Sequence, residues 1–248
     1  MVTAFPIRAG GARRSFAVRF LEKYFYFSMS LIIAAIVIYG FSHTLGAKLL
    51  HPKVPRPLLL YFHAACFSLW PLFFILQSAL VRTRNVRLHK LTGWFGAALA
   101  GVMVPLGCTV GIVMARFDLR VLHQQQHSEY VLIVSLHDML AFTATILPAI
   151  LLRRKPELHR RFVYIATCTL TAAAFGRFPT DFFPPLYFYW GVDTLILLGA
   201  LRDLAVTRRI HKIYLFALPL LFAAQSAVWA MADNHWPPWE RFAHAVIG

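Results

Sequence analysis

The chain has 248 residues, of which 59% are hydrophobic and only 14% are charged, and it carries a net charge of +15. Soluble domains have about twice that charged fraction, so the composition excludes an ordinary soluble protein and favours one embedded in a bilayer. The positive charge lies in short segments between apolar stretches, a pattern typical of cytoplasmic loops near anionic lipids. We therefore expect the lipid bilayer, with anionic lipids at the cytoplasmic face, as a partner and expect no nucleic acid.

The apolar stretches predict an all-α, polytopic membrane protein with seven transmembrane helices. The expected spans are 24–46, 58–81, 91–115, 130–152, 162–178, 186–206 and 213–232. Residues 1–23 form a basic N-terminal tail, residues 24–232 the transmembrane domain, and residues 233–248 a short interfacial C-terminal tail. Spans 2–5 are expected to form the core of the bundle. The glycines of the third span favour close helix contacts and a central position for that span.

The distribution of lysine and arginine predicts the orientation of the chain. Of the 25 Lys and Arg residues, 18 lie in the N-terminal tail and in segments 82–90, 153–161 and 202–212, at the ends of the second, fourth and sixth spans. The side richer in these residues faces the cytoplasm. We therefore expect a cytoplasmic N-terminus, an outer C-terminus and a location in the plasma membrane.

Ionisable residues inside the predicted spans suggest functional sites, because a charge in a bilayer is costly. An outer layer of such residues contains His63, His137, Asp138, Arg177 and Asp193. A purely structural interpretation is an internal salt bridge in which Arg177 neutralises Asp138 or Asp193 and only holds helices together.

A second layer lies at the cytoplasmic starts of three spans. It contains His89, His159 and His211, each followed directly by Lys or Arg, and also Asp203. The simple alternative is that these histidines contact lipid phosphates at the headgroup level. Three histidines at one depth make this alternative harder to accept as coincidence.

Four of the histidines recur in a weak internal repeat, which predicts a cofactor site. His63 precedes a basic loop and His89 by 26 residues, and His137 precedes a basic loop and His159 by 22 residues. Haem iron accepts two axial imidazoles, and cofactor sites in bundles use residues on facing helices. We expect His89 with His159 to bind one b-type haem, and His63 with His137 to bind another. Such a protein would transfer electrons across the membrane and would need a redox partner.

Two alternatives use the same layout differently. His89, His159 and His211 could bind Zn²⁺ at the cytoplasmic face, with Asp203 orienting one imidazole, and the protein could then be a hydrolase. The other alternative is a module without catalysis, such as a subunit of a complex whose arginine clusters contact anionic lipids. These alternatives leave open whether the protein is an enzyme.

Several segments resemble an uncharacterised bacterial integral-membrane family. The segments are FHAACFSLWPLFFILQSALV (62–81), RLHKLTGW (87–94), KPELHRRFVYIAT (155–167) and LRDLAVTRRIHKIY (201–214). This resemblance implies a location in the bacterial inner membrane and no particular activity. The placement of the four repeated histidines also resembles that in ascorbate-type transmembrane di-haem cytochromes b. That resemblance implies haem ligation by His89 with His159 and by His63 with His137.

Overall fold

The computed structural model describes residues 15–181, 187–234 and 236–248, and these residues form helices and no strand. The long helices are α1 (Phe16–Leu45), α2 (Leu58–Arg82), α3 (Val86–Arg120), α4 (Gln125–Leu151), α7 (Phe188–Thr207) and α8 (Lys212–Asp233). The shorter ones are a π-helical turn, η1 (Gly46–Leu50), and α5 (Pro156–Thr169), α6 (Ala172–Phe175) and α9 (Pro237–Ile247).

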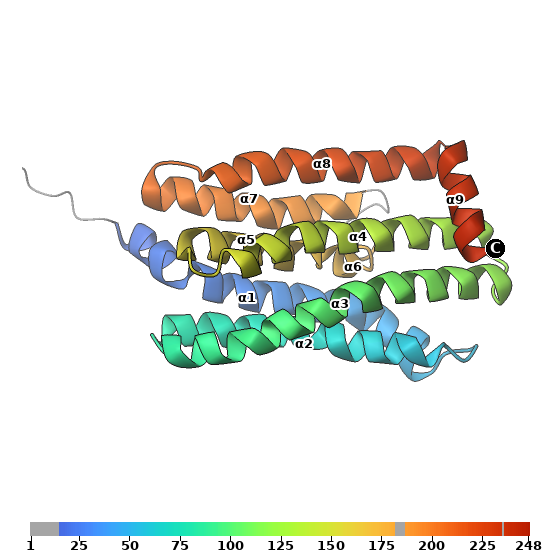
Figure 1. The fold of residues 1–248 in the computed structure, drawn as a ribbon, viewed down its shortest axis with the longest axis horizontal. Coiled ribbons are helices and arrows are strands. Elements are labelled where there is room, and N and C mark those ends of the chain that lie inside the picture. The colour runs from blue at the N-terminus through green and yellow to red at the C-terminus, as the bar shows by residue number, and fades with distance from the viewer. Residues whose placement is uncertain (1–14, 182–186, 235) are drawn as a thin grey trace, which may run out of the picture.

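The long helices run up and down in a bundle, as Figure 1 shows. Helices α1, α3, α5 and α8 begin at one end, which we call the basic end because the loops rich in Lys and Arg lie there. The other end, where α2 and α4 begin, carries α9 and is called the α9 end. At this end Ala243 and Ile247 of α9 are buried against Ala115 and Leu132 of α3 and α4.

Five of the helical segments are long and apolar enough to cross a membrane, which fits a membrane-embedded protein. They are Phe16–Leu50, Leu58–Arg82, Val86–Arg120, Gln125–Leu151 and Lys212–Asp233. The first begins eight residues before the expected start of span 1, so α1 includes part of the predicted tail. The two other predicted spans differ from these five: residues 162–178 are divided between α5 and α6, and α7 contains three charged residues, Asp193, Arg202 and Asp203.

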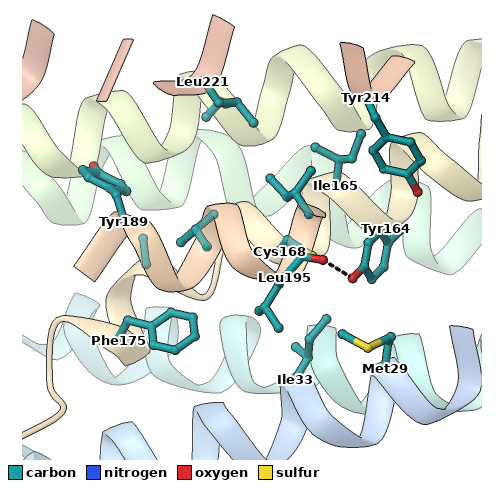
Figure 2. Packing of buried hydrophobic residues seen from close by; sticks show 14 of the residues in the cluster. Met29, Ile33, Tyr164, Ile165, Cys168, Phe175, Tyr189, Leu195, Tyr214 and Leu221 are labelled. Atoms are coloured by element: carbon teal, nitrogen blue, oxygen red, sulfur yellow. Dashed lines mark hydrogen bonds between the residues drawn. The ribbon is translucent and has the colours of Figure 1, made fainter. Parts of the chain in front are cut away.

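The central position belongs to α5 rather than to α3. Every residue from Tyr164 to Thr169 is buried, because α1, α2, α4, α7 and α8 all contribute side chains around this helix. Figure 2 shows Tyr164, Ile165 and Cys168 of α5 packed beside side chains of α1, α7 and α8. The Tyr164 hydroxyl donates a hydrogen bond to the backbone oxygen of Leu195, which ties α5 to α7.

The glycines of α3 explain its close contact with α4, but not all of them take part. A Cβ atom on Gly111 would lie 2.6 Å from the Cβ of Ser135, and one on Gly107 would collide with the side chain of Met139. Gly93 and Gly101 face open space instead. Small residues therefore bring the two backbones together only on the face of α3 that meets α4.

Candidate functional site

The structure brings His89 and His159 together at the basic end. Their ring centroids are 6.3 Å apart, and the planes of the rings are inclined at 74°. Both side chains are partly buried. The two residues come from different helices, since His89 lies in the first turn of α3 and His159 in the first turn of α5.

Local sequence signals fix the starts of these two helices. The side chain of Asn85 accepts a hydrogen bond of 3.2 Å from the backbone N–H of Leu88 and thereby caps α3. Pro156 is the first residue of α5, a position where its missing N–H has no helical partner to lose. His89 therefore lies four residues after Asn85, and His159 lies three residues after Pro156, each following a residue that favours helix initiation.

The hydrogen bonds of the two rings leave nitrogen atoms available for a ligand. Nδ1 of His159 is 2.8 Å from the backbone oxygen of Ala149 at the end of α4. A carbonyl oxygen only accepts, so Nδ1 carries the proton and the neutral ring presents Nε2 as a lone-pair donor. Nδ1 of His89 is buried and has no hydrogen-bond partner among the described residues.

The separation of the rings is suitable for binding one metal atom between them. A metal–nitrogen bond of about 2.0 Å and a distance of about 1.1 Å from nitrogen to ring centroid place two opposed imidazoles roughly 6 Å apart. The observed 6.3 Å agrees with this distance. The pair can therefore supply two ligands, one from each helix.

His211 is not a third member of this pair. It caps α8, and its Nδ1 accepts a hydrogen bond of 3.2 Å from the backbone N–H of Ile213. Burial lowers the pKa of His211 below its ordinary value, and the positive charge of Arg161 lowers it further. Within the described part of the chain, no three His, Cys, Asp or Glu side chains are placed to hold a metal ion. The described residues thus provide no three-histidine zinc site.

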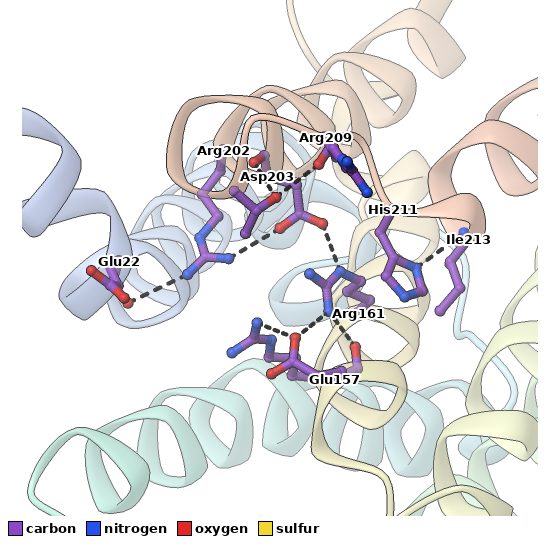
Figure 3. Close-up of polar contacts among 10 residues, drawn as sticks. Glu22, Glu157, Arg161, Arg202, Asp203, Arg209, His211 and Ile213 are labelled. Carbon is purple, nitrogen blue, oxygen red and sulfur yellow. Dashed lines mark hydrogen bonds and ion pairs between the residues drawn. The ribbon is translucent and has the colours of Figure 1, made fainter.

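Asp203 instead neutralises two buried arginines, as Figure 3 shows. Its carboxylate accepts hydrogen bonds from Arg161 Nε at 2.7 Å and from Arg202 Nη1 at 3.0 Å. The Asp203 side chain is 0% exposed and those of the two arginines are 3% exposed. Asp203 makes no hydrogen bond to a histidine among the described residues, so it does not orient an imidazole directly.

Glu157 extends this network toward the surface. Its carboxylate accepts a hydrogen bond of 2.8 Å from Arg161 Nη1, four residues later on α5. Partial burial by itself would raise the pKa of Glu157, but the hydrogen bond from Arg161 and the nearby arginine charges outweigh it, and the pKa is lowered. The network thereby joins the start of α5, which carries His159, to the end of α7.

The outer layer forms a different group around Tyr189 of α7. The Tyr189 hydroxyl lies 2.8 Å from Asp138 Oδ1 and 2.9 Å from His137 Nδ1, and these two atoms are 3.2 Å apart. The side chain of His137 is 8% exposed, and its Nε2 is buried without a partner among the described residues. His137 therefore has one nitrogen held by a hydroxyl and a carboxylate and the other available.

The other predicted members of the outer layer do not join this group. His63 stacks on Phe67, with ring centroids 4.0 Å apart, and its Nδ1 is buried without a partner among the described residues. No contact between His63 and His137 is present in the described part of the chain. Asp193 accepts a hydrogen bond of 3.1 Å from Gln225 Nε2 on α8.

The alternative interpretation, a salt bridge of Arg177 with Asp138 or Asp193, has no such ion pair among the described residues to support it. Arg177 donates a hydrogen bond to the backbone oxygen of Ala173 and lies over the ring of Phe41, 4.4 Å from its centroid. Arg177 lies two residues after the end of α6, and its side chain turns back along that helix and toward Phe41 of α1 instead of crossing to α4 or α7.

Four residues of these groups were not expected from the sequence: Arg161, Arg202, Tyr189 and Gln225. A signal existed for Arg161, because it follows Glu157 by four residues and such pairs meet on a helix. A different signal existed for Arg202, because an arginine inside an apolar span, directly before Asp203, is costly unless it is paired. Tyrosine and glutamine in apolar stretches gave no comparable signal.

The polar residues thus form three groups: the His89–His159 pair, the arginine network around Asp203, and the group around Tyr189. The first two lie at the basic end, and the third lies closer to the α9 end. Comparison of the chain with family models, with curated proteins and with solved structures gives no match.

Proposed function

We propose that this chain is a seven-span protein of the bacterial inner membrane that transfers electrons through a b-type haem bound by His89 and His159. The observation that carries this proposal is the 6.3 Å distance between the centroids of the two imidazole rings. The rings come from α3 and α5, so a ligand between them would link two helices of the bundle.

Haem suits this pair better than a zinc ion does, because of the number of ligands that the protein must supply. A zinc site needs three or four protein ligands, and the described residues offer no such group. Haem brings four nitrogens of its own and needs only two axial ligands from the protein. A pair of imidazoles with centroids 6.3 Å apart and no third ligand among the described residues therefore favours haem.

The chain's own residues would hold and tune such a group. The hydrogen bond from His159 Nδ1 to Ala149 fixes the ring orientation and directs Nε2 away from α4, as in other histidine ligands held by a backbone carbonyl. The haem would supply one-electron redox chemistry at the basic end. Lys90 and Arg160, next to the two histidines, would supply positive charge for the carboxylates of the haem.

The seven-span topology with a cytoplasmic N-terminus is part of the proposal. Five helices are long enough and apolar enough to cross a membrane. The paired segments α5–α6 and helix α7 would add the other two spans, with their charged residues sheltered inside the bundle. The excess of Lys and Arg at the end where α1, α3, α5 and α8 begin supports placing this end in the cytoplasm.

A second haem between His63 and His137 is a further part of the proposal, and fewer observations support it. His137 has its Nδ1 beside a carboxylate and its Nε2 buried and unpartnered, which is the arrangement of many metal-bound histidines. His63 also has an unpartnered nitrogen. Transfer across the whole membrane would require this outer site as well as the inner one.

The test is the absorption spectrum of the protein purified in detergent from cells supplied with haem precursor. We expect a Soret band and, after reduction with dithionite, the sharp visible bands of six-coordinate low-spin haem. His89→Ala and His159→Ala should each abolish the inner-site signal. His211→Ala is the matched control, because it removes a histidine at the same end that belongs to another group.

The haem content per chain separates the two sites. Two haems, of which one is lost in His137→Ala, would support both sites, and one haem unaffected by His137→Ala would support the inner site alone. Absence of a Soret band in the folded protein, or an unchanged spectrum in His89→Ala, would refute the proposal.

One observation favours a second candidate function, a module that contacts anionic lipids. In the sequence, 18 of the 25 Lys and Arg residues lie in residues 1–23 and in segments 82–90, 153–161 and 202–212. Each basic residue near an anionic bilayer contributes about 1 kcal/mol to the attraction. A colourless protein that is stabilised by phosphatidylglycerol at low salt, and less at high salt, would support this function instead of electron transfer.

A further inference from the structure

A cavity of about 290 Å³ lies at the α9 end, between α4, α8 and α9. It is at the small end of the range for ligand pockets. The cavity is at the opposite end of the bundle from the His89–His159 pair, since α4 begins near the cavity and ends near that pair. It is therefore separate from the proposed haem site.

The charge of this cavity is opposite to that of the chain. Although the protein carries a net charge of +15, three of its ten Asp and Glu residues line the cavity. They are Glu129 of α4, Asp233 of α8 and Glu240 of α9. Among the described residues that line the cavity there is no Lys or Arg. A positively charged ligand would therefore be attracted to this cavity in particular.

Aromatic side chains form the other part of the wall. Tyr130, Trp229 and Trp239 all line the cavity, and the rings of Tyr130 and Trp229 are tilted by 34° with centroids 6.0 Å apart. Aromatic faces attract cations, and Trp attracts them most strongly. Quaternary ammonium groups are recognised by aromatic residues arranged in this way.

The aromatic wall is held in place from behind. The ring of Trp229 contacts Phe188 and Tyr189 of α7, with centroid distances of 5.6 Å and 6.3 Å. Tyr189 in turn bonds the His137–Asp138 pair, in which His137 Nε2 has no partner among the described residues. The cavity thus lies one aromatic layer away from a buried polar group, and its wall is part of the packed bundle rather than a surface loop.

We propose that this cavity binds a small organic cation with a quaternary or methylated ammonium group. The aromatic rings would contact the methylated surface of the cation, and Glu129 and Asp233 would balance its charge. The same group occurs in soluble cations and in choline lipid headgroups, and the cavity at the α9 end could receive either.

The test is isothermal titration calorimetry of the purified chain with tetramethylammonium chloride, at constant ionic strength in a non-ionic detergent. We expect saturable binding. Trp229→Leu should weaken it about tenfold, in line with a desolvated cation–π contact, and Asp233→Asn should weaken it about two- to fivefold. Asp181→Asn is the matched control, because it removes a carboxylate that does not line the cavity and should leave the affinity unchanged.

Further measurements distinguish the two sources of the cation and guard against misfolding. In nanodiscs, weaker tetramethylammonium binding in phosphatidylcholine than in phosphatidylethanolamine, which has the same net charge but no methyl groups, would identify the lipid headgroup as occupant, and equal binding would identify a soluble cation. Trp229 contacts the core, so the exposed Asp233 provides the variant that should fold normally. No saturable binding, or equal weakening by Asp181→Asn and Asp233→Asn, would overturn the proposal.

Discussion

Replacing Asp203 by Asn tests whether the buried arginine network holds α5 against α7. The substitution keeps the shape of the side chain but removes the negative charge that pairs with both Arg161 and Arg202. Asp203 is fully buried, and the arginine side chains are 3% exposed, so water cannot replace the lost charge. Breaking a buried ion pair by removing one partner costs about 3–5 kcal/mol. We expect Asp203→Asn to destabilise the protein by that amount.

The assay is thermal unfolding of the detergent-solubilised protein. A change of 1 kcal/mol shifts the midpoint by about 2–4 °C for a chain of this size, so Asp203→Asn should lower it by roughly 6–20 °C. Asp181→Asn is the control, and its effect should stay within about 0.5 kcal/mol because the residue is exposed. A midpoint within 2 °C of the original, which is within about 1 kcal/mol, would refute the reasoning. Replacing Asp203 and both arginines together by apolar residues should recover much of the loss.

Three further predictions concern single contacts. Gly111→Ala should destabilise the protein by about 1–3 kcal/mol in thermal unfolding, because the new methyl group collides with α4, whereas Gly101→Ala, which faces open space, should be neutral or slightly stabilising. Tyr189→Phe should lower the free energy of unfolding by about 1–3 kcal/mol, because His137 Nδ1 and Asp138 Oδ1 lose the hydroxyl that they contact. An unchanged unfolding midpoint would contradict this expectation. The lowered pKa of His211 means that the unfolded chain binds a proton more readily than the folded one, so stability should fall as the pH decreases below about 6.5. His211→Asn keeps a capping side chain and should remove this part of the pH dependence, which unfolding midpoints at a series of pH values between 5 and 8 would measure.

The sequence was sufficient to predict the apolar helices, because a bilayer requires long apolar runs and basic loops separate them. It did not predict the break after α5. Residues 162–178 are apolar enough to look continuous, but Thr169 and Thr171 donate their hydroxyls to backbone oxygens three residues earlier. Such local bonds compete with the regular helical pattern. The break therefore coincides with side-chain hydrogen bonds that hydropathy does not represent.

The sites were predictable to a similar, partial extent. The positions of His89 and His159 at helix starts suggested that they share one depth, and the structure places their rings 6.3 Å apart. The acceptor for His159, the oxygen of Ala149, could not be predicted, because it depends on how α4 ends above α5. The separation of His211 from the pair likewise depends on the position of α8, which periodicity does not determine.

The unsatisfied nitrogens of three histidines are one reason for the proposal that these residues bind a ligand. A buried ion pair can often be replaced by apolar residues of similar volume without loss of stability, so folding alone does not require the charges on α5 and α7. Here His89, His63 and His137 each keep a buried nitrogen that no described residue satisfies. Leaving buried polar atoms unpaired costs stability, and a ligand that supplies the missing partner would recover that cost.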